Sequence, residues 1–540
     1  MSSENMNIFT EAPTPGCALP HVDVSSCLRK EEGESMEIRK MFAGWMALAA
    51  GLALGWTGTL AGQSLPPTHV DDFTGRPRVI VLSDIGNEPD DQMSLVRLLI
   101  YSNELEIEGL IASTSTWQKT AIHPETMRKL IEAYGQARPN LLLNAQGWPE
   151  AAELLSRVYA GQPGYGMAAT GEGKASEGAK AIVRALERDD SRPLWVCIWG
   201  GANTLAQALM ELRTSKPPEE AARLVGKLRV YSISDQDDAG AWMRREFPGL
   251  LYIVMPSTQD GNEYYFATWT GISSDAYYSK EVGADPSEVT NAWLDENIRS
   301  KGPLGKVYPR VAYIMEGDTP SYLGLIDNGL DAYRRPDWGG WGGRYVYRQP
   351  HGETHPFWSQ GGNELGHGNS QDTVIGADGQ EHTSDQATIW RWRNAFQNDF
   401  AARMTWTVAD FAHSIHRPLV EVNGAAGTAP VELDVTVGQS VTLDASRSTN
   451  PDGQKLHFHW FHYAEAGSAD GNLAGVTLTD AETNRATVRA ESVCGSPGLW
   501  PTPCKGMGVA HIILAVTGEG KLPLTSYRRI ILHVRPAASK

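Results

Sequence analysis

The chain has 540 residues, of which 41% are hydrophobic, and it carries a formal net charge of -17. This length exceeds that of one ordinary domain, so we expect two or more domains. The acidic balance, without any block of Lys and Arg, argues against nucleic acid as a partner, because phosphate binding needs clustered basic side chains.

The amino-terminal residues have the order of an export signal. Residues 36–41 form a short basic stretch, and the mostly apolar residues 42–60 lead into small residues. This pattern is typical of a signal peptide, which we place at 36–62, after a mis-called or disordered leader at 1–35. The alternative is an uncleaved membrane anchor, because the apolar run approaches spanning length. Cleavage predicts a secreted or periplasmic protein without a stable membrane span.

The most informative segment joins a predicted strand to a predicted helix. The apolar run at 78–82 is typical of a buried parallel strand. Four carboxylates follow it within eight residues: Asp84, Glu88, Asp90 and Asp91. Open α/β sheets bind ligands at the carboxyl ends of their strands, and crowded carboxylates repel unless a cation or a raised pKa relieves them. Ca²⁺, which prefers oxygen ligands, fits such a cluster. The alternative is that these acids only cap the next helix.

From residue 78 to about 330, strand-like and helix-like stretches alternate. The predicted strands are 79–82, 107–112, 194–198, 228–233 and 250–254. The predicted helices are 91–102, 124–134, 176–188, 203–212 and 239–246. This rhythm predicts an α/β fold with a mostly parallel sheet wrapped by helices.

Two further features could belong to the same ligand crevice. Asp235 lies in a second acidic loop, directly after a predicted strand, so it could contact the substrate; equally, that loop could cap the following helix. Trp117, Trp338 and Trp341 lie in predicted loops, where their rings could stack on a sugar.

Beyond residue 330 the pattern changes. Residues 331–385 resemble one long loop rich in Gly, Trp and His, and long loops are usually functional or mobile. A helix is predicted at 387–407. Residues 419–540 alternate like half-buried strands and predict an Ig-like β-sandwich. Within it, Cys494 and Cys504 bound a Pro/Gly loop, so an exported protein is expected to form a disulfide there.

Several segments together resemble a known enzyme superfamily. The acid segment Asp84–Asp91, with Leu194–Ala206 and Met315–Tyr322, resembles the nucleoside hydrolases. Together with Gly109–Trp117, it looks more like the exported nucleoside-hydrolase-like group described as cellulose-binding proteins. The resemblance implies a nucleoside-hydrolase-like domain at 78–415, followed by the β-sandwich.

The resemblance implies roles for individual residues. In nucleoside hydrolases the acids hold a Ca²⁺ that binds sugar hydroxyls and a water, and one Asp removes a proton from that water as it attacks the anomeric carbon. The implied metal ligands are Asp84, Asp91, Asp318 and the backbone carbonyl near Trp199. The implied substrate contacts are Asp90 and Asn203.

The chain departs from the family pattern Asp-x-Asp-Pro-Gly-x-Asp-Asp at the catalytic position. Aligned without a gap, Gly86 stands where the catalytic Asp should be, whereas a two-residue insertion gives that place to Asp84. Glu88 could also supply the carboxylate. Two functions therefore stay open: an exported, Ca²⁺-assisted hydrolase of a glycosidic or N-ribosidic bond in a carbohydrate or nucleoside-like molecule, and a non-catalytic, cellulose-type carbohydrate-binding protein. A structural module of a surface assembly is a third.

Overall fold

The computed structural model describes most of the chain after the proposed signal peptide. The described residues are 65–257, 264, 266–273, 283–350, 352–359, 370–495 and 506–538. The proposed leader and signal peptide at 1–62 lie outside them, as does Cys504. Within these ranges, no helix combines the length and apolar character needed to cross a membrane.

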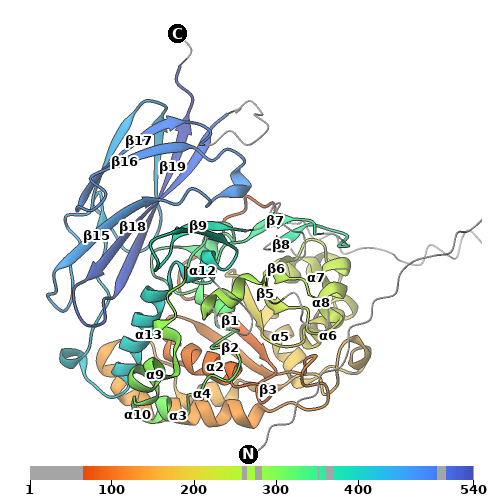
Figure 1. The fold of residues 1–540 in the computed structure, drawn as a ribbon. Coiled ribbons are helices and arrows are strands. Elements are labelled where there is room, and N and C mark those ends of the chain that lie inside the picture. Colours follow the sequence, from red (N-terminus) through yellow and green to blue (C-terminus); the bar gives the residue numbers. More distant parts are fainter. Residues whose placement is uncertain are drawn as a thin grey trace, which may run out of the picture. The chain divides into compact units, whose positions relative to one another are not determined.

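A sheet of eight strands forms the centre of the amino-terminal part, in the order β3-β2-β1-β4-β5-β6-β8-β7 (Figure 1). The strands are β1 (Arg78–Ser83), β2 (Glu106–Ala112), β3 (Val158–Ala160), β4 (Leu194–Ile198), β5 (Leu228–Ser234), β6 (Leu251–Met255), β7 (Val346–Arg348) and β8 (Phe357–Ser359). Neighbouring strands are parallel from β3 through β8, and only β7 runs antiparallel to its neighbour. The predicted fold class is confirmed.

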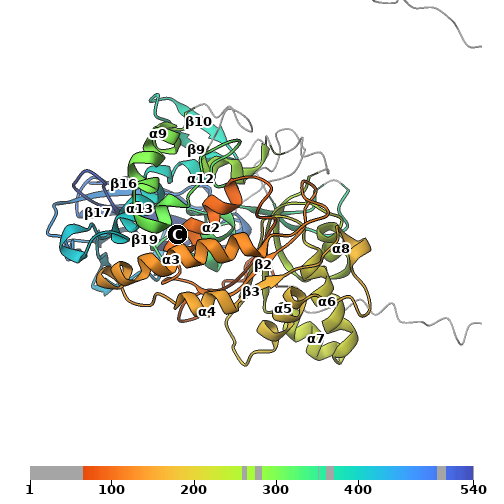
Figure 2. The same cartoon turned by 90° about the horizontal axis from the view of Figure 1, so that it is seen from below.

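Helices cover both faces of this sheet. They are α2 (Asp90–Ile100), α3 (Pro124–Asn144), α4 (Ala151–Ser156), α5 (Glu177–Glu187), α6 (Asn203–Ser215), α7 (Pro218–Val225), α8 (Ala239–Glu246), α9 (Asn291–Leu294), α10 (Gly302–Lys306), α11 (Pro320–Leu323), α12 (Ala387–Trp390) and α13 (Arg393–Trp406). Because side chains alternate along a strand, Val79 and Val81 of β1 join one apolar cluster with α2 and α3. Ile80 and Leu82 join a second cluster with α5 and α6. Figure 2 shows α2 and α3 on one side of the sheet, and α5 and α6 on the other.

The strand order places a natural binding position beside β1. The chain moves outward from β1 to β2 and β3 on one side, and from β4 to β5 and β6 on the other. The carboxyl ends of β1 and β4 therefore meet where the direction reverses, which is where doubly wound sheets bind ligands. The predicted acid loop follows β1 at this position, and Trp199 follows β4.

The structure differs from the sequence-based expectation in three segments. The expected loop at 331–385 contains β7, β8 and a hairpin of β9 (Asp372–Ile375) and β10 (Glu381–Ser384). The helix expected at 387–407 is divided into α12 and α13. Helix α3 continues past Gly135, where a Cβ would lie 2.8 Å from the Cβ of Ala151, so this glycine lets α4 pack closely against α3.

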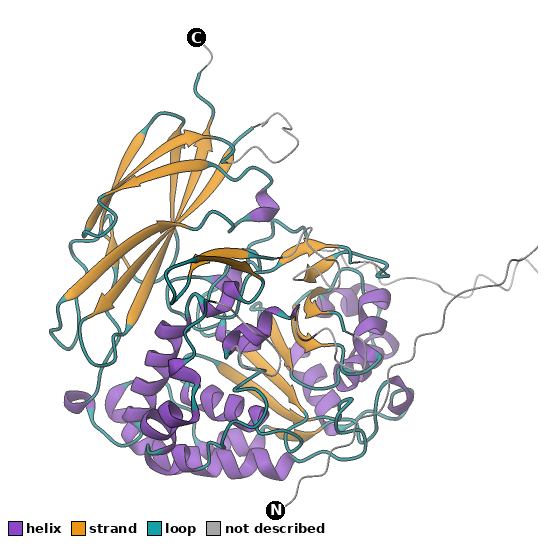
Figure 3. Cartoon of the chain, viewed as in Figure 1, coloured by secondary structure: helices purple, strands orange, loops and turns teal. Residues whose placement is uncertain are grey.

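The carboxyl-terminal part is built almost entirely of strands (Figure 3). One sheet has the order β13-β19-β18-β15 and a second has the order β14-β17-β16. These strands are β13 (Val431–Thr436), β14 (Ser440–Asp444), β15 (Leu456–His462), β16 (Gly475–Thr479), β17 (Arg485–Ser492), β18 (Gly508–Gly518) and β19 (Thr525–Arg535). A short pair, β11 (Glu421–Val422) and β12 (Ala425–Ala426), precedes them. Buried apolar residues fill the sandwich between the sheets, and Cys494 is disulfide-bonded.

Contacts join the sandwich to the α/β part. Arg529 of β19 is fully buried and donates to the backbone carbonyls of Leu330, Trp338 and Gly339 at 2.7, 3.0 and 2.8 Å. Tyr527 of the same strand belongs to the apolar cluster that also contains Trp341. The two parts therefore share one stretch of apolar core.

Candidate functional site

A pocket of about 410 Å³ lies where the strand order reverses. Its lining residues are Asp84, Asn87, Glu88, Asp90, Asp91, Trp117, Trp199, Ile233, Gln236, Tyr264, Trp269, Ile314, Gly317 and Asp318. Five of these are carboxylates, and no Lys, Arg or His is among these described lining residues. The pocket therefore has a strongly acidic floor with aromatic walls.

The acids reach the pocket from two distant parts of the chain. Asp84 and Glu88 lie in the loop after β1, and Asp90 and Asp91 form the first turn of α2. Asp318 comes from the turn before α11. One ligand oxygen from each of Asp90, Asp91 and Asp318 lies within 4.8 Å of the others. The fold thus brings together acids that are more than 200 positions apart in the sequence.

This spacing suits a divalent cation. Oxygen ligands of Ca²⁺ lie about 2.3–2.6 Å from the ion, so two ligands on opposite sides are about 5 Å apart. Oδ2 of Asp318 is buried and has no hydrogen-bond partner among the described residues. A buried polar atom without a partner is unusual and commonly points to an ion or water. The donor set and the spacing therefore fit Ca²⁺.

Burial and mutual repulsion shift the pKa values of these acids upward. Burial raises the pKa of Asp84 to about 6, although a hydrogen bond from Ser115 lowers it in part. Burial, together with the charges of Glu88 and Asp84, raises the pKa of Asp90 to about 8. The pKa values of Asp91 and Asp318 also lie well above their ordinary value, first through burial and then through neighbouring carboxylates. Without a cation, the cluster therefore holds protons at neutral pH.

Glycines set how closely the backbone approaches these acids. Gly86 has a φ of +107°, and a Cβ there would lie 2.7 Å from Cδ2 of His123. Position 86 therefore faces His123 and does not line the pocket, whereas Asp84 and Glu88 both do. A Cβ on Gly200 would lie 2.8 Å from Oδ1 of Asp84, so glycine is required there for Asp84 to keep its place.

The resemblance also implied a backbone carbonyl after β4 as a ligand. Trp199 lines the pocket, and its carbonyl oxygen accepts a hydrogen bond from Nε2 of Gln236 at 2.6 Å. A carbonyl oxygen has a second lone pair, so this bond leaves one acceptor position. Oε1 of Gln236 is itself buried and has no hydrogen-bond partner among the described residues.

Two expected substrate contacts lie outside the pocket. Asn203 is fully buried, and its Nδ2 donates to the carbonyl of Gly164 at 2.7 Å. Asp235 forms a two-pronged ion pair with Arg244, with distances of 2.9 and 2.8 Å. Asn203 thus binds the backbone and Asp235 binds an arginine side chain. Neither residue belongs to the pocket lining.

Of the three loop tryptophans, only one reaches the pocket. Trp117 lines it and is 45% exposed. Trp338 and Trp341 are 4% and 1% exposed, so the structure contradicts the idea that their rings stack on a sugar. They belong to the protein interior because the segment that carries them packs against the sandwich.

Sequence reasoning did not find several lining residues. Gln236 and Ile233 carried a usable signal, because both lie at the carboxyl end of β5, beside the acidic loop already considered. Tyr264 and Trp269 carried none, because their segment has no regular periodicity; their rings meet edge to face at 5.3 Å. Gly317 lines the pocket without a side chain, and a Cβ there would lie 2.9 Å from Oδ2 of Asp90.

Comparison with known proteins covers both parts of the chain. The family model "Cellulose-binding Sde182, nucleoside hydrolase-like domain" matches residues 78–345. The model "Cellulose-binding protein Sde0182, C-terminal domain" matches residues 440–534. A search of curated proteins finds no significant match.

Several solved structures match the chain. One of them is a nucleoside hydrolase-related hypothetical protein from Saccharophagus degradans, described as associated with carbohydrate metabolism. It is 34% identical, with a TM-score of 0.69, and the match covers 85% of this chain and 100% of that one. The PKD domain from KIAA 1837 protein is 24% identical over 21% of this chain and 88% of its own, with a TM-score of 0.14. The effector protein XOO4466 is 10% identical over 62% of this chain and 95% of its own, with a TM-score of 0.28.

The match with the Saccharophagus degradans protein covers 85% of this chain and that protein's entire length, so it includes both the α/β part and the carboxyl-terminal sandwich. The two family models match successive parts of the chain. The chain therefore belongs to the family of cellulose-binding Sde182 proteins with a nucleoside hydrolase-like domain.

Proposed function

We propose that this protein is an exported hydrolase that cleaves a glycosidic or N-ribosidic bond of a carbohydrate with the help of Ca²⁺. One observation carries the proposal: ligand oxygens of Asp90, Asp91 and Asp318 converge within 4.8 Å in a buried pocket that also contains Asp84 and Glu88.

In this proposal some of the acids bind the cation and another acts as the general base. Asp90, Asp91 and Asp318 hold the cation, and Asp90 also accepts a hydrogen bond from a sugar hydroxyl. A bound Ca²⁺ supplies positive charge that orients the sugar and lowers the pKa of a water. Asp84 would accept a proton from a water as the oxygen of that water attacks the anomeric carbon; the bond to the leaving group breaks, and the leaving group takes up a proton from solvent. Glu88 is the alternative acceptor of the proton from the water. A pKa near the working pH suits a general base, and burial raises that of Asp84 to about 6.

The remaining carboxylates support the same chemistry. Cleavage at an anomeric carbon passes through a transition state that resembles an oxocarbenium ion and carries positive charge. Fixed negative groups in a pocket shielded from water stabilise such a charge as it develops. Asp84 and Asp91 are 4% and 5% exposed, so the floor of this pocket is shielded.

Aromatic side chains near the pocket support a carbohydrate as the ligand. Trp117 lines the pocket and is 45% exposed. Phe266 and Tyr313, at 42% and 47% exposed, lie close in sequence to the lining residues Trp269 and Ile314. Exposed aromatic rings offer an apolar face with polar surroundings, which complements the apolar face of a sugar ring.

The proposal is tested by measuring Ca²⁺ affinity and activity together. Calorimetry with Ca²⁺, and assays on nitrophenyl glycosides and nucleosides with and without chelator, should show binding and turnover in the wild type. Asp318→Asn should abolish both. Asp235→Asn is a matched control, because this carboxylate also follows a strand of the same sheet but lies outside the pocket. Wild-type protein that neither binds Ca²⁺ nor releases product from any substrate would sink the proposal.

A non-catalytic carbohydrate-binding protein is the second candidate. The exposed Trp117 and the cellulose-binding name of both matching family models favour it. This candidate predicts binding to cellulose that survives chelation, no release of reducing sugar, and a loss of binding in Trp117→Ala. Export is tested separately, by sequencing the amino terminus of protein recovered outside the cytoplasm; a mature end near residue 62 is expected.

A further inference from the structure

We propose that the buried ion pair between Arg97 and Glu316 is the device that holds Asp318 at the correct distance from Asp90 and Asp91. Both residues of the pair lie outside the pocket lining, so they act through Asp318 and are positioning residues. The inference rests on the proposed function only in that Ca²⁺ binding is one of its two readouts.

Helix α2 carries two carboxylates of the acid cluster and also the arginine of the ion pair. Asp90 and Asp91 form its first turn, and Arg97 lies about two turns later. Nε of Arg97 lies 2.5 Å from Oε2 of Glu316, and both side chains have zero exposure. Because Glu316 precedes Asp318 by two residues, a single rigid helix presents two of the three converging carboxylates and also anchors the segment that supplies the third.

The anchored segment has an unusual backbone. Glu316 has a φ of 59°, in the left-handed region that residues with a Cβ seldom adopt. Its side chain is held from several sides, because Oε1 accepts a hydrogen bond from Tyr308 Oη at 2.6 Å and Oε2 accepts one from Thr319 Oγ1 at 3.1 Å. The amide of Thr319 donates to the carbonyl of Glu316 at 3.1 Å and closes the turn around Asp318. The side-chain contacts of Glu316 thus fix a turn that its backbone preference disfavours.

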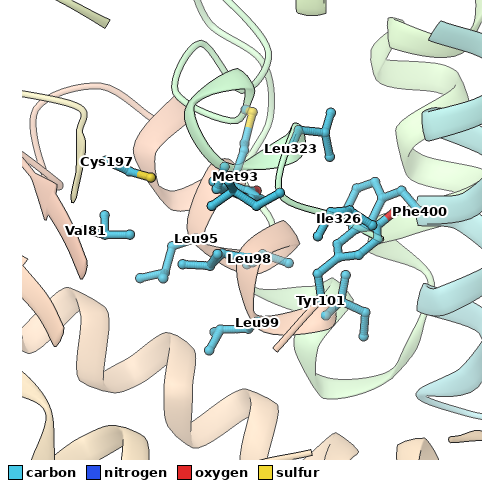
Figure 4. Close-up of a cluster of buried hydrophobic side chains, with 14 of the residues drawn as sticks. Val81, Met93, Leu95, Leu98, Leu99, Tyr101, Cys197, Leu323, Ile326 and Phe400 are labelled. Atoms are coloured by element: carbon cyan, nitrogen blue, oxygen red, sulfur yellow. The ribbon is translucent and has the colours of Figure 1, made fainter. Parts of the chain in front are cut away.

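The guanidinium of Arg97 is equally constrained. It lies 4.0 Å from the centroid of the Phe400 ring, and its Nη1 donates to the carbonyl of Phe396 at 3.3 Å. Figure 4 shows Leu95 and Leu98 of α2 in one apolar cluster with Leu323 and Phe400. Because dense apolar packing surrounds both partners, the pair has little freedom to shift.

A role in stability alone does not account for this arrangement. Taking two charges out of water offsets much of their attraction, and replacing a buried pair with uncharged side chains of similar volume is often neutral. A left-handed glutamate adds a further unfavourable contribution. The buried ion pair and the left-handed backbone of Glu316 both lie beside Asp318. Their role is therefore to set the position of Asp318 in the charged cluster.

The test uses a charge-neutral double variant, Arg97→Met with Glu316→Gln, so that a change in net charge cannot explain the result. The control is Arg229→Met with Asp71→Asn. That pair is also buried, with Nε 2.7 Å from Oδ2, but it lies at the opposite, amino end of β5. For each protein we would measure the dissociation constant for Ca²⁺, the melting temperature and a crystal structure without cation.

The double variant should bind Ca²⁺ about 10- to 100-fold more weakly, the range typical when a group that orients a ligand is lost. Its crystal structure should show the oxygen of Asp318 displaced beyond the 4.8 Å that it keeps from Asp90 and Asp91. The control pair should leave both the Ca²⁺ affinity and the position of Asp318 unchanged. Arg97→Lys, which keeps the charge, should fall between the wild type and the double variant.

The outcomes separate this inference from the proposed function. Wild-type protein without Ca²⁺ affinity would overturn the proposed function, and the cation-free crystal structures would still decide where Asp318 lies in the double variant. An acid cluster that keeps its wild-type geometry and affinity in the double variant would overturn the inference. If the double variant does not fold, Glu316→Gln alone, which can retain its contact with Tyr308, is judged by the same two measurements.

Discussion

The crowded carboxylates predict that the cation-free protein becomes less stable as the pH rises. Burial raises the pKa of Asp84 from 3.8 to about 6, so the folded protein binds this proton more tightly than the unfolded chain does. Such a group favours the folded state fully below its unfolded pKa, and the contribution is lost as the pH rises through the folded value. Stability should therefore fall between about pH 4 and pH 6 through Asp84, and on toward pH 8 through Asp90, whose pKa is about 8.

The magnitude for Asp84 follows from its shift of about two pKa units. One unit corresponds to about 1.4 kcal/mol, so the ionised carboxylate disfavours the folded state by roughly 3 kcal/mol above pH 6. Asp84→Asn removes this charge and keeps the side-chain shape. In EDTA the variant should melt several degrees above the wild type at pH 8, because 1 kcal/mol shifts the melting temperature by roughly 2–4 °C in mid-sized domains and less in larger ones.

Melting curves followed by circular dichroism in EDTA at pH 4, 6 and 8 measure this effect. The two proteins should melt together at pH 4 and separate as the pH rises. Asp235→Asn is the contrasting variant, because its carboxylate is paired with Arg244 and its loss should lower the melting temperature. An Asp84→Asn protein that melts below the wild type at pH 8 would refute the reasoning.

Three other outcomes follow from the site. At pH 7, millimolar Ca²⁺ should raise the melting temperature of the wild type but not of Asp318→Asn; an equal rise in both would show that the ion binds elsewhere. Gly200→Ala should lower turnover at least about tenfold by displacing Asp84, since its Cβ would lie 2.8 Å from Oδ1, whereas Gly226→Ala, far from the pocket, should not. Trp117→Ala should weaken binding to a cellulose oligomer without changing the dissociation constant for Ca²⁺; unchanged oligomer binding would remove this ring from the proposed sugar contacts.

The sequence predicts an element correctly where its local hydrophobic pattern agrees with its place in the fold. The run before Asp84 predicts a buried strand, and β1 is buried at every position. The approach of Asp318 to Asp91 came only from the resemblance, because no local pattern links two segments so far apart. The structure brings their oxygens within reach of one cation.

The remaining differences have physical causes that a single sequence does not reveal. Asp235 and Gln236 are neighbours at the end of β5, and the bend of the chain sends one to Arg244 and the other into the pocket. Periodicity could not separate them. Strands β7 and β8 were missed because three residues are too few for an alternating pattern to be recognised.

The contact through Arg529 changes how the two family modules should be regarded. Deleting the sandwich would leave the carbonyls of Leu330, Trp338 and Gly339 without their buried donor and would expose the face of Trp341 that meets Tyr527. The carboxyl-terminal module is therefore not a detachable appendage on a tether. It completes the buried core of the α/β part, and severing it should yield insoluble protein.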